Sequence, residues 1–311
     1  MNPRAEAYER LGGRYEVRVL EPSPPAIDSD PWYADDPAAR ADVPSGREVV
    51  SPVATGDLRW EQLAAEDPQL ADWCADRWLG SYRRLGQAPA NLVATRLALH
   101  ALAERVIAPA RRNANTKFGL RYTRGGFGTP FFGDDVQIRV VGNELIVVES
   151  GHERRAPITS LDAAAEHIGR RLLPDDVELG ADALGVDPEA AAFLGEWYGF
   201  AASVLEELRA GTGNAPDLAR VQLWPEHFDL AVDLGSADAG GRASYGLSPG
   251  DEQHPEPYAY VAPWETPAPG ELWQGVGFSG AELGYGELLD APDQRQAALE
   301  FFRTRLTALT N

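Results

Sequence analysis

Two segments in the second half of the chain carry side chains that could bind a ligand or transfer protons. The first contains His227 and Asp229, two residues apart, and the second runs from Asp251 to Tyr258. Residues at i and i+2 of a strand project from the same face, so we expect His227 and Asp229 to point together into a site. Imidazole, carboxylate and phenol groups suit hydrogen bonding and proton transfer. We therefore predict a ligand site, with catalysis left open, at His227, Asp229, Asp251, Glu256 and Tyr258.

The same pair could also serve as metal ligands together with His254. Two imidazoles and one carboxylate form the ligand set of mononuclear non-haem iron sites. His254 precedes Pro255 in a proline-rich segment, whose extended backbone does not fix the direction of the side chain. A divalent metal in a metal-dependent enzyme that uses His227, Asp229 and His254 is therefore an alternative. Proton transfer by the His–Asp pair without metal and a merely solvated polar face are two others.

Two further segments are similar to a nucleophile motif and to a nucleotide-binding loop, but their neighbouring residues do not fit those functions. Residues 246–250 read Gly-Leu-Ser-Pro-Gly and match the G-x-S-x-G nucleophile motif. The residue after the serine must donate its N–H to an oxyanion, and Pro249 has none. We therefore reject Ser248 as a nucleophile and expect a Pro-Gly turn between strands. Residues 125–128 read Gly-Gly-Phe-Gly without the spacing of a nucleotide-binding loop, so we expect a glycine-rich turn and no nucleotide cofactor.

The overall charge narrows the range of partners. The 311 residues carry 48 acidic against 28 basic side chains, a net charge of −20. Such a field repels phosphate backbones and anionic lipids, so we expect a small-molecule ligand and neither nucleic acid nor a membrane as partner. Cys74 is the only cysteine, which excludes an internal disulfide and a multi-cysteine metal site. With no secretory signal and no apolar run near ~20 residues, the cytoplasm is the expected location. The oligomeric state stays open.

The His227–Asp229 pair lies in the clearest strand pattern of the chain, predicted over 223–234. One side of this strand should face the core and the other the site. The core side would hold Trp224, Phe228, Leu230, Val232 and Leu234, and the other side His227, Asp229, Ala231 and Asp233. Aromatic residues gather nearby, where they would wall a pocket or fill the core. They are Trp224, Tyr245, Tyr258, Tyr260, Trp264, Trp273, Phe278 and Tyr285.

Further elements must position this strand. Apolar spacing predicts a helix over 91–108 that Pro109 ends, with Arg96 and His100 on a charged stripe. Asp187 followed by Pro188 predicts a capped helix that ends at Gly211. Gly142-Asn143 predicts a tight hairpin between strands 136–141 and 144–149. Further strands are predicted at 117–123, 243–247, 258–261 and 272–278. A helix over 161–172, capped by Ser160, and a last helix from Asp290 complete the prediction. These elements predict an α+β fold with antiparallel sheets and packed helices.

The chain divides into three predicted parts. Residues 1–57 are rich in Pro and Asp and should form an extended arm packed on the body, with one strand over 14–20. Residues 58–178 would form one lobe from a helical hairpin, with helices at 60–79 and 91–108, and a β-hairpin. Residues 186–311 would form another lobe from a helix, antiparallel strands and a C-terminal helix. An alternative function follows: a non-enzymatic interaction or scaffold protein that uses its acidic surface and the arm.

Three motifs give the chain a resemblance to a known family. They are Trp224-Pro225-Glu226-His227-Phe228-Asp229, Ser248-Pro249-Gly250-Asp251 and Glu256-Pro257-Tyr258-Ala259-Tyr260-Val261. The chain thereby resembles a family of uncharacterised bacterial proteins with W-P-x-H-F-D, S-P-G-D and E-P-Y-x-Y-V motifs, over about residues 220–285. No activity is established for that family, so the resemblance implies no catalytic residues. The leading hypothesis is a small-molecule-binding protein whose site lies in the C-terminal half.

Overall fold

The computed structural model of the protein describes residues 15–20, 47–52, 65–69, 85–123, 125–130, 132–133, 136–149, 152–175, 177, 179–212 and 219–310. Near the N-terminus, strand β1 (Tyr15–Leu20) pairs antiparallel with β2 (Arg47–Pro52). The sequence predicts β1 but not β2. Most of the predicted arm and of the helix predicted over 60–79 lies outside the described residues.

Two antiparallel five-stranded sheets dominate the described fold, and the predicted α+β class is confirmed. The strands of the first sheet follow chain order: β3 (Arg121–Thr123), β4 (Gly126–Gly128), β5 (Val136–Val141), β6 (Glu144–Glu149) and β7 (His152–Pro157). The hairpin of β5 and β6 turns at Gly142-Asn143, as predicted, with Gly142 at a φ of 57°. In the glycine-rich stretch predicted as a turn, Gly125 lies in a turn with a φ of 80°, whereas residues 126–128 form strand β4, which pairs with β5.

The second sheet carries the region of His227 and Asp229. Its order is β12-β11-β10-β9-β8, formed by β8 (Gln222–Trp224), β9 (Asp229–Leu234), β10 (Ala243–Ser248), β11 (Tyr258–Pro263) and β12 (Ala281–Gly284). The single strand predicted over 223–234 is wrong, because the chain reverses in a turn at 225–228. Phe228 has a φ of 57° there, which an extended strand does not allow. The strand predicted over 272–278 is also wrong, since these residues form a loop before β12.

The helices after the first sheet begin at the predicted caps. Ser160 accepts from the backbone N–H of Ala163 at 3.1 Å and starts α6 (Leu161–Ile168). Asp187 accepts from the backbone N–H of Ala190 at 2.9 Å and starts α7 (Pro188–Gly211), which ends where predicted. Two helices close the chain, α8 (Tyr285–Asp290) and α9 (Gln294–Thr310), so the last helix begins later than predicted.

The helix predicted over 91–108 does not end at Pro109. α4 (Leu92–Leu102) passes through a π-helical turn (Ala103–Ile107) into α5 (Ala108–Asn115). Pro109 lies in the first turn of α5, where its missing N–H removes no hydrogen bond of that helix. The wider π turn therefore lets the chain continue helically past a residue that would otherwise break it.

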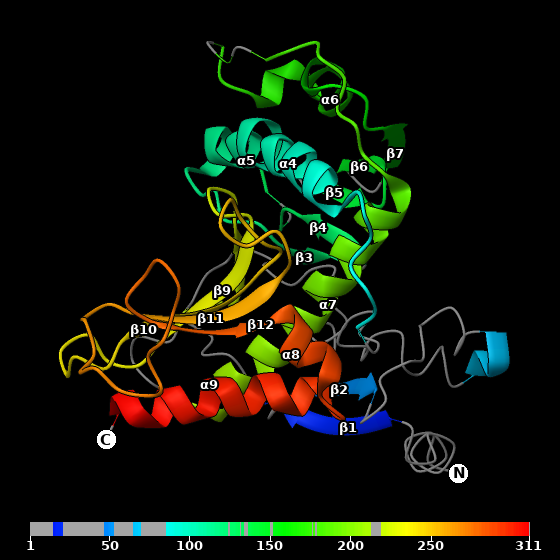
Figure 1. Ribbon diagram of the computed structural model, residues 1–311. Coiled ribbons are helices and arrows are strands. Elements are labelled where there is room, and N and C mark those ends of the chain that lie inside the picture. Colours follow the sequence, from blue (N-terminus) through cyan, green and yellow to red (C-terminus); the bar gives the residue numbers. More distant parts are fainter. Residues whose placement is uncertain are drawn as a thin grey trace.

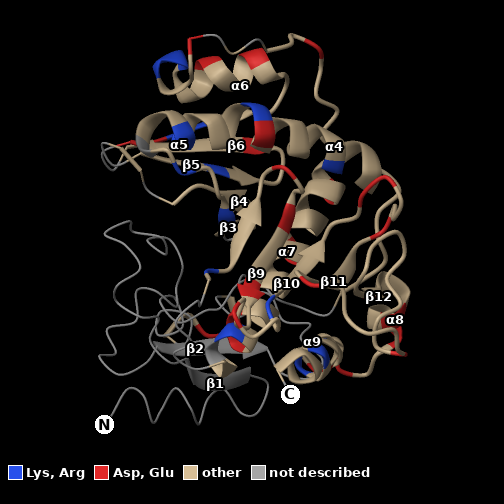
Figure 2. Ribbon diagram, turned by 90° about the vertical axis from the view of Figure 1, so that its left-hand side faces the viewer, with Lys and Arg blue, Asp and Glu red and all other residues tan. Residues whose placement is uncertain are grey.

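Helix α7 joins the two sheets. It contacts β3, β4 and β5 of the first sheet, β9 and β10 of the second, and also α4 and α9 (Figure 1). Most buried hydrophobic residues of the described chain form one cluster that includes Val106, Trp197 and Phe302, so a common core runs through both predicted lobes. Acidic positions occur throughout the described fold (Figure 2). None of the described helices combines the length and the apolar character needed to cross a membrane.

Candidate functional site

A pocket lies on one face of the second sheet. Along β9, Leu230, Val232 and Leu234 are buried in the core, on the side that α7 packs. Asp229, Ala231 and Asp233 alternate to the opposite face and line a cavity of about 850 Å³. The polar side predicted for this strand is therefore confirmed from Asp229 onward. His227 also lines the cavity, but from the turn at 225–228 rather than from the strand.

Small residues make the floor of this pocket hollow. Ala231, Ser244 and Ala262 line it from three neighbouring strands. Gly246 lies opposite Tyr260 in the register of β10 and β11, and a Cβ at this glycine would stand 2.4 Å from the Tyr260 ring. The ring therefore lies over β10, and its hydroxyl donates to Asp229 on β9. A glycine at 246 allows a side chain of β11 to reach a partner two strands away.

Asp229 is the buried carboxylate of the floor, with 3% of its surface exposed. Its Oδ2 accepts from the Tyr260 hydroxyl, and its Oδ1 has no hydrogen-bond partner among the described residues. Burial raises the pKa of Asp229 from 3.8 to about 6, although the bond from Tyr260 and the charge of His227 act to lower it. Burial and the charge of Asp229 also raise the pKa of Tyr260, which keeps its proton. At neutral pH this leaves a buried, ionised carboxylate with one unsatisfied oxygen.

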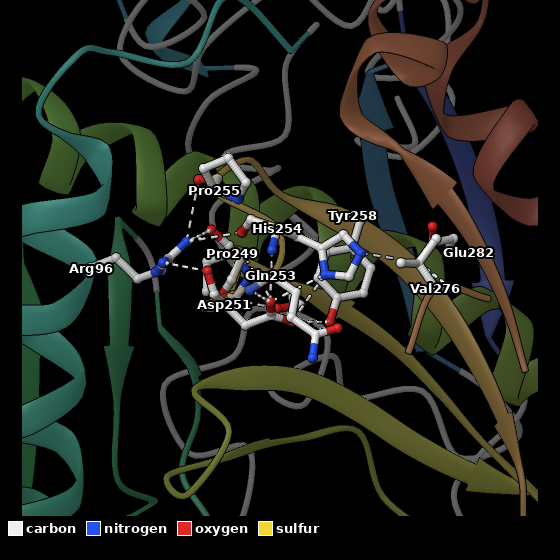
Figure 3. A network of polar contacts seen from close by, with 11 residues as sticks. Arg96, Pro249, Asp251, Gln253, His254, Pro255, Tyr258, Val276 and Glu282 are labelled. Atoms are coloured by element: carbon white, nitrogen blue, oxygen red, sulfur yellow. Dashed lines mark hydrogen bonds and ion pairs between the residues drawn. The ribbon is translucent and has the colours of Figure 1, made fainter. Parts of the chain in front are cut away.

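Asp251 is an exposed carboxylate in the rim loop, residues 249–257, which connects β10 to β11. Its Oδ1 accepts from the backbone N–H groups of Gln253 at 2.7 Å and His254 at 2.8 Å. Its Oδ2 accepts from the Tyr258 hydroxyl at 2.6 Å (Figure 3). Partial burial acts to raise the pKa of Asp251, but these hydrogen bonds outweigh it and lower that pKa. Asp251 therefore closes the rim loop on itself.

His254 ties the rim loop to β12. Its Nδ1 lies 3.1 Å from Oδ1 of Asp251, and its Nε2 lies 3.3 Å from Oε2 of Glu282 (Figure 3). The imidazole packs at a tilt on Tyr258, with ring centroids 4.4 Å apart. Burial and the bond to Asp251 raise the pKa of Tyr258, so its phenol stays a donor. Both imidazole nitrogens contact carboxylates of the protein, which makes His254 a residue that organises the rim.

Ser248 completes the rim loop at the end of β10. Its hydroxyl accepts from the backbone N–H of Gly250 at 3.1 Å, and Gly250 has a φ of 103°. This is the predicted Pro-Gly turn, and the serine hydroxyl is used inside it. The rejection of Ser248 as a nucleophile rests on the missing N–H of Pro249 and stays a prediction.

Arg96 of α4 holds the rim loop from behind. The side chain is buried, and its Nη1 donates to the carbonyl oxygens of Pro249 and Pro255, each at 3.3 Å. Its Nη2 donates to the carbonyl oxygen of Asp251 at 2.9 Å (Figure 3). Burial lowers the pKa of Arg96, and the charge of Asp251 opposes this. With a longer bond from Nη1 to the carbonyl oxygen of His254 at 3.5 Å, the guanidinium thus connects four carbonyls of one loop to a helix of the core.

His100 lies one helical turn after Arg96 and holds the turn at 225–228. Its Nε2 lies 2.9 Å from the carbonyl oxygen of Pro225, and its ring stacks on Phe228 with centroids 5.2 Å apart. Tyr198 of α7 donates to the carbonyl oxygen of Phe228 at 2.7 Å. The charged stripe predicted on this helix is therefore wrong for both residues, since Arg96 is buried and His100 half-buried. One face of α4 positions two edges of the pocket.

The structure assembles most of the predicted ligand site. His227, Asp229, Asp251 and Tyr258 line the pocket, whereas Glu256 is exposed on the rim loop and is not among the lining residues. The predicted metal ligands do not form a set: among the described residues, no three His, Cys, Asp or Glu side chains are grouped to hold a metal ion. The turn at 225–228 removes His227 from the strand, and His254 contacts Asp251 and Glu282 instead.

The aromatic residues predicted around the site divide between the two faces of the sheet. Tyr245 and Tyr285 are buried in the core, and Trp273 packs against it. Trp264 is 59% exposed, with the guanidinium carbon of Arg242 4.9 Å from its ring centroid. The other predicted aromatic residues line the pocket, and so does Phe118 from the segment before β3. They are Trp224, Tyr258, Tyr260 and Phe278.

Sequence reasoning missed Arg96 and Gly246 and did not select Tyr260 as a site residue. A signal exists for Arg96, which lies between Leu92 and Leu99 at helical spacing and thus on the apolar face. Gly246 interrupts a strand pattern, which often marks a close approach of another group. Tyr260 gives no such signal, because its contact with Asp229 depends on strand order rather than on spacing along the chain.

Comparisons with protein-family models, curated proteins and solved structures find no match for this chain. The family resemblance of its three motifs stays a prediction.

Proposed function

We propose that the protein binds a small organic molecule in the pocket over the second sheet. The observation that carries this proposal is Asp229, a buried carboxylate with one unpartnered oxygen at the floor of the cavity. Buried polar groups almost always find a hydrogen-bond partner, and an ionised carboxylate is costly to bury without one. A polar group of a bound molecule would supply that partner.

The size and lining of the pocket support the proposal. Sites for small molecules enclose about 300–1,000 Å³ and combine apolar or aromatic walls with a few polar groups. This cavity has a volume of about 850 Å³, with aromatic walls that include Trp224 and Phe278. Asp229 lies on the floor, and Asp233 beside it accepts from the Ser244 hydroxyl at 2.7 Å. The proposal concerns binding and assigns no reaction.

The anchored edges also favour binding. Arg96 and His100 fix the rim loop and the turn at 225–228 to the same helix. A pocket whose edges are held in place loses little conformational entropy when a ligand binds. The protein thus holds, inside a preformed cavity, a carboxylate with one oxygen that has no partner among the described residues.

The experiment is a thermal-shift measurement with three small aromatic probes and two variants. The probes are 2-phenylethylammonium, 2-phenylethanol and phenylacetate. Ala262→Phe places a ring in the pocket from a half-buried position, and Ala237→Phe changes an exposed alanine outside the lining. We expect at least one probe to raise the Tm of the wild type and of Ala237→Phe but not of Ala262→Phe.

Two results would contradict the proposed function. One is that no probe raises the Tm of the wild type. The other is that Ala262→Phe responds to the probes as the wild type does, since binding would then occur elsewhere.

A further inference from the structure

We infer that the ligand is an organic cation, a molecule whose ammonium or guanidinium group pairs with Asp229. The inference rests on the proposed function, because it requires the pocket to be the binding site. It adds the chemical class of the ligand, which three independent features of the pocket support: its charge, the state of Asp229 and its aromatic walls.

The charge of the lining is of one sign. None of the described residues that line the pocket is Lys or Arg, whereas five carry carboxylates: Glu226, Asp229, Asp233, Asp251 and Glu252. Arg96 lies behind the rim loop, and its guanidinium donates to carbonyls of that loop. A concave site with low-dielectric walls focuses such a field and concentrates cations. An anionic ligand would meet repulsion there.

The state of Asp229 points to a charged partner at the floor. Its Oδ1 has no hydrogen-bond partner among the described residues and its side chain is buried, so a further donor and a positive charge at this oxygen would stabilise the ionised form. The described groups that act on it include Tyr260, which donates one hydrogen bond, its own backbone N–H, His227 at the exposed mouth and the like-charged Asp233. An ammonium or guanidinium group supplies the donor and the positive charge together.

The aromatic walls suit a cation that also has an organic body. Tyr258 and Tyr260 have ring centroids 6.1 Å apart, and the Tyr260 ring meets Phe278 edge to face at 6.4 Å. Trp224 lines the pocket on the side of β8, where it is paired with Asp229 in the register. The faces of tryptophan and tyrosine rings attract ammonium and guanidinium groups and also pack against hydrocarbon.

The same features disfavour an inorganic cation. Metal ions such as Mg²⁺ and Ca²⁺ need several oxygen ligands around one point. No three His, Cys, Asp or Glu side chains of the described chain are grouped in that way. Asp251 and His254 are bonded to each other, and Asp233 accepts from Ser244. The volume of about 850 Å³ also far exceeds the needs of a single ion.

The test is isothermal titration calorimetry at pH 7.5 with the same three probes, which are similar in size but differ in charge, and with MgCl₂ and CaCl₂. The proteins are the wild type, Asp229→Asn and the control Asp238→Asn, an exposed aspartate outside the lining. We expect 2-phenylethylammonium to bind the wild type and Asp238→Asn at least about tenfold more tightly than either other probe. Asp229→Asn should weaken the ammonium probe by at least about tenfold while 2-phenylethanol changes little.

The outcomes separate this inference from the proposed function. If 2-phenylethanol or phenylacetate binds as tightly as the ammonium and Ala262→Phe blocks it, the pocket is a ligand site and the cation inference is overturned. A divalent ion that binds with dependence on Asp229 and excludes the ammonium also overturns it. If no probe binds, the inference and the proposed function fail together.

A second readout keeps the inference falsifiable should Asp229→Asn fail to fold. Protonation of Asp229 removes the counter-charge, so the affinity of the wild type for the ammonium should rise at least about threefold between pH 5 and pH 7. The amine stays protonated over this range. An affinity that is constant or falls as the pH rises overturns the inference.

Discussion

The floor and the rim of the pocket each carry an aspartate that accepts a hydrogen bond from a tyrosine hydroxyl. The two aspartates differ in burial and in the direction of their pKa shifts. Asp229 on the floor is buried, and one of its oxygens has no partner among the described residues. Asp251 on the rim is exposed and accepts from two backbone N–H groups and from Tyr258. Burial raises the pKa of the first, and hydrogen bonds lower the pKa of the second.

This difference means that the Asp251 carboxylate stabilises the fold, whereas the ionised Asp229 carboxylate destabilises it. The rim carboxylate accepts hydrogen bonds from its own loop and from Tyr258 at the start of β11, so it contributes to the structure of the rim. The floor carboxylate is ionised at a cost to stability, which is typical of residues kept for function. The two aspartates should therefore respond to pH and to substitution in opposite directions.

The largest expected effect is on the rim. Arg96→Met removes a buried guanidinium that donates to four carbonyls of the rim loop, and the free energy of unfolding should fall by about 4 kcal/mol. Urea denaturation measures the loss, and hydrogen exchange should quicken in residues 249–257. Arg112→Met, at an exposed position of α5, is the control and should change stability by less than about 0.5 kcal/mol. An unchanged free energy of unfolding for Arg96→Met would show that the guanidinium does not stabilise the rim loop.

On the floor, Asp229→Asn should alter the pH dependence of stability. The pKa of Asp229 is raised in the folded state, so its protonated form stabilises the fold, and this contribution is lost as the pH rises from 3.8 through about 6. At about 1.4 kcal/mol per pH unit, the wild type should lose about 3 kcal/mol that the variant does not lose. Denaturation between pH 4 and pH 7.5, with Asp238→Asn as control, measures this. If the free energies of unfolding of wild type and variant change in parallel with pH, the pKa of Asp229 is not raised in the folded state.

Gly246→Ala tests how the floor is built. The new Cβ would stand 2.4 Å from the Tyr260 ring, so the ring must move and its bond to Asp229 should break. Overpacking of this kind costs about 2 kcal/mol in the free energy of unfolding. The matched control is Gly286→Ala in α8, where a Cβ would meet nothing within 4 Å and helix propensity favours alanine. If the two variants have equal free energies of unfolding, Gly246 is not needed for Tyr260 to contact Asp229.

The smallest effect is expected for Asp251→Ala. The loss of its hydrogen bonds should lower the free energy of unfolding by about 1.5 kcal/mol, as for other aspartates that accept from local backbone groups. The pKa of Asp251 is lowered in the folded state, so its contribution is present above the ordinary value of 3.8 and is lost as the pH falls below that value. Denaturation at pH 7 and pH 3 compares the two conditions. A deficit that persists unchanged at pH 3 would contradict this role.

Features that depend on neighbours in the chain could be predicted from the sequence. The Gly142-Asn143 hairpin, the caps at Ser160 and Asp187 and the polar side of β9 all follow from local spacing. Four of the five predicted ligand residues also line the pocket, because each lies on or next to a strand of one sheet.

Features that depend on long-range packing could not be predicted. The reversal of the chain at 225–228 could not be predicted from spacing, because the positive φ of Phe228 is stabilised by His100 and Tyr198 from distant helices. The contact of Tyr260 with Asp229 requires β10 to lie between their strands. The spacing of Arg96 signals that it lies on the apolar face of its helix, but not that its partners are carbonyls of the rim loop, which is distant in the chain.

The most direct test of the central claim is a carbon-13 NMR titration of the Asp229 side-chain carboxyl, assigned by its absence from Asp229→Asn. The titration is run on the free protein and on protein saturated with 2-phenylethylammonium. The account predicts a pKa near 6 in the free protein and a lower pKa in the bound one, because a cation favours the ionised form. A pKa at or below the ordinary 3.8 in the free protein, or one that the bound probe leaves unchanged, would contradict it.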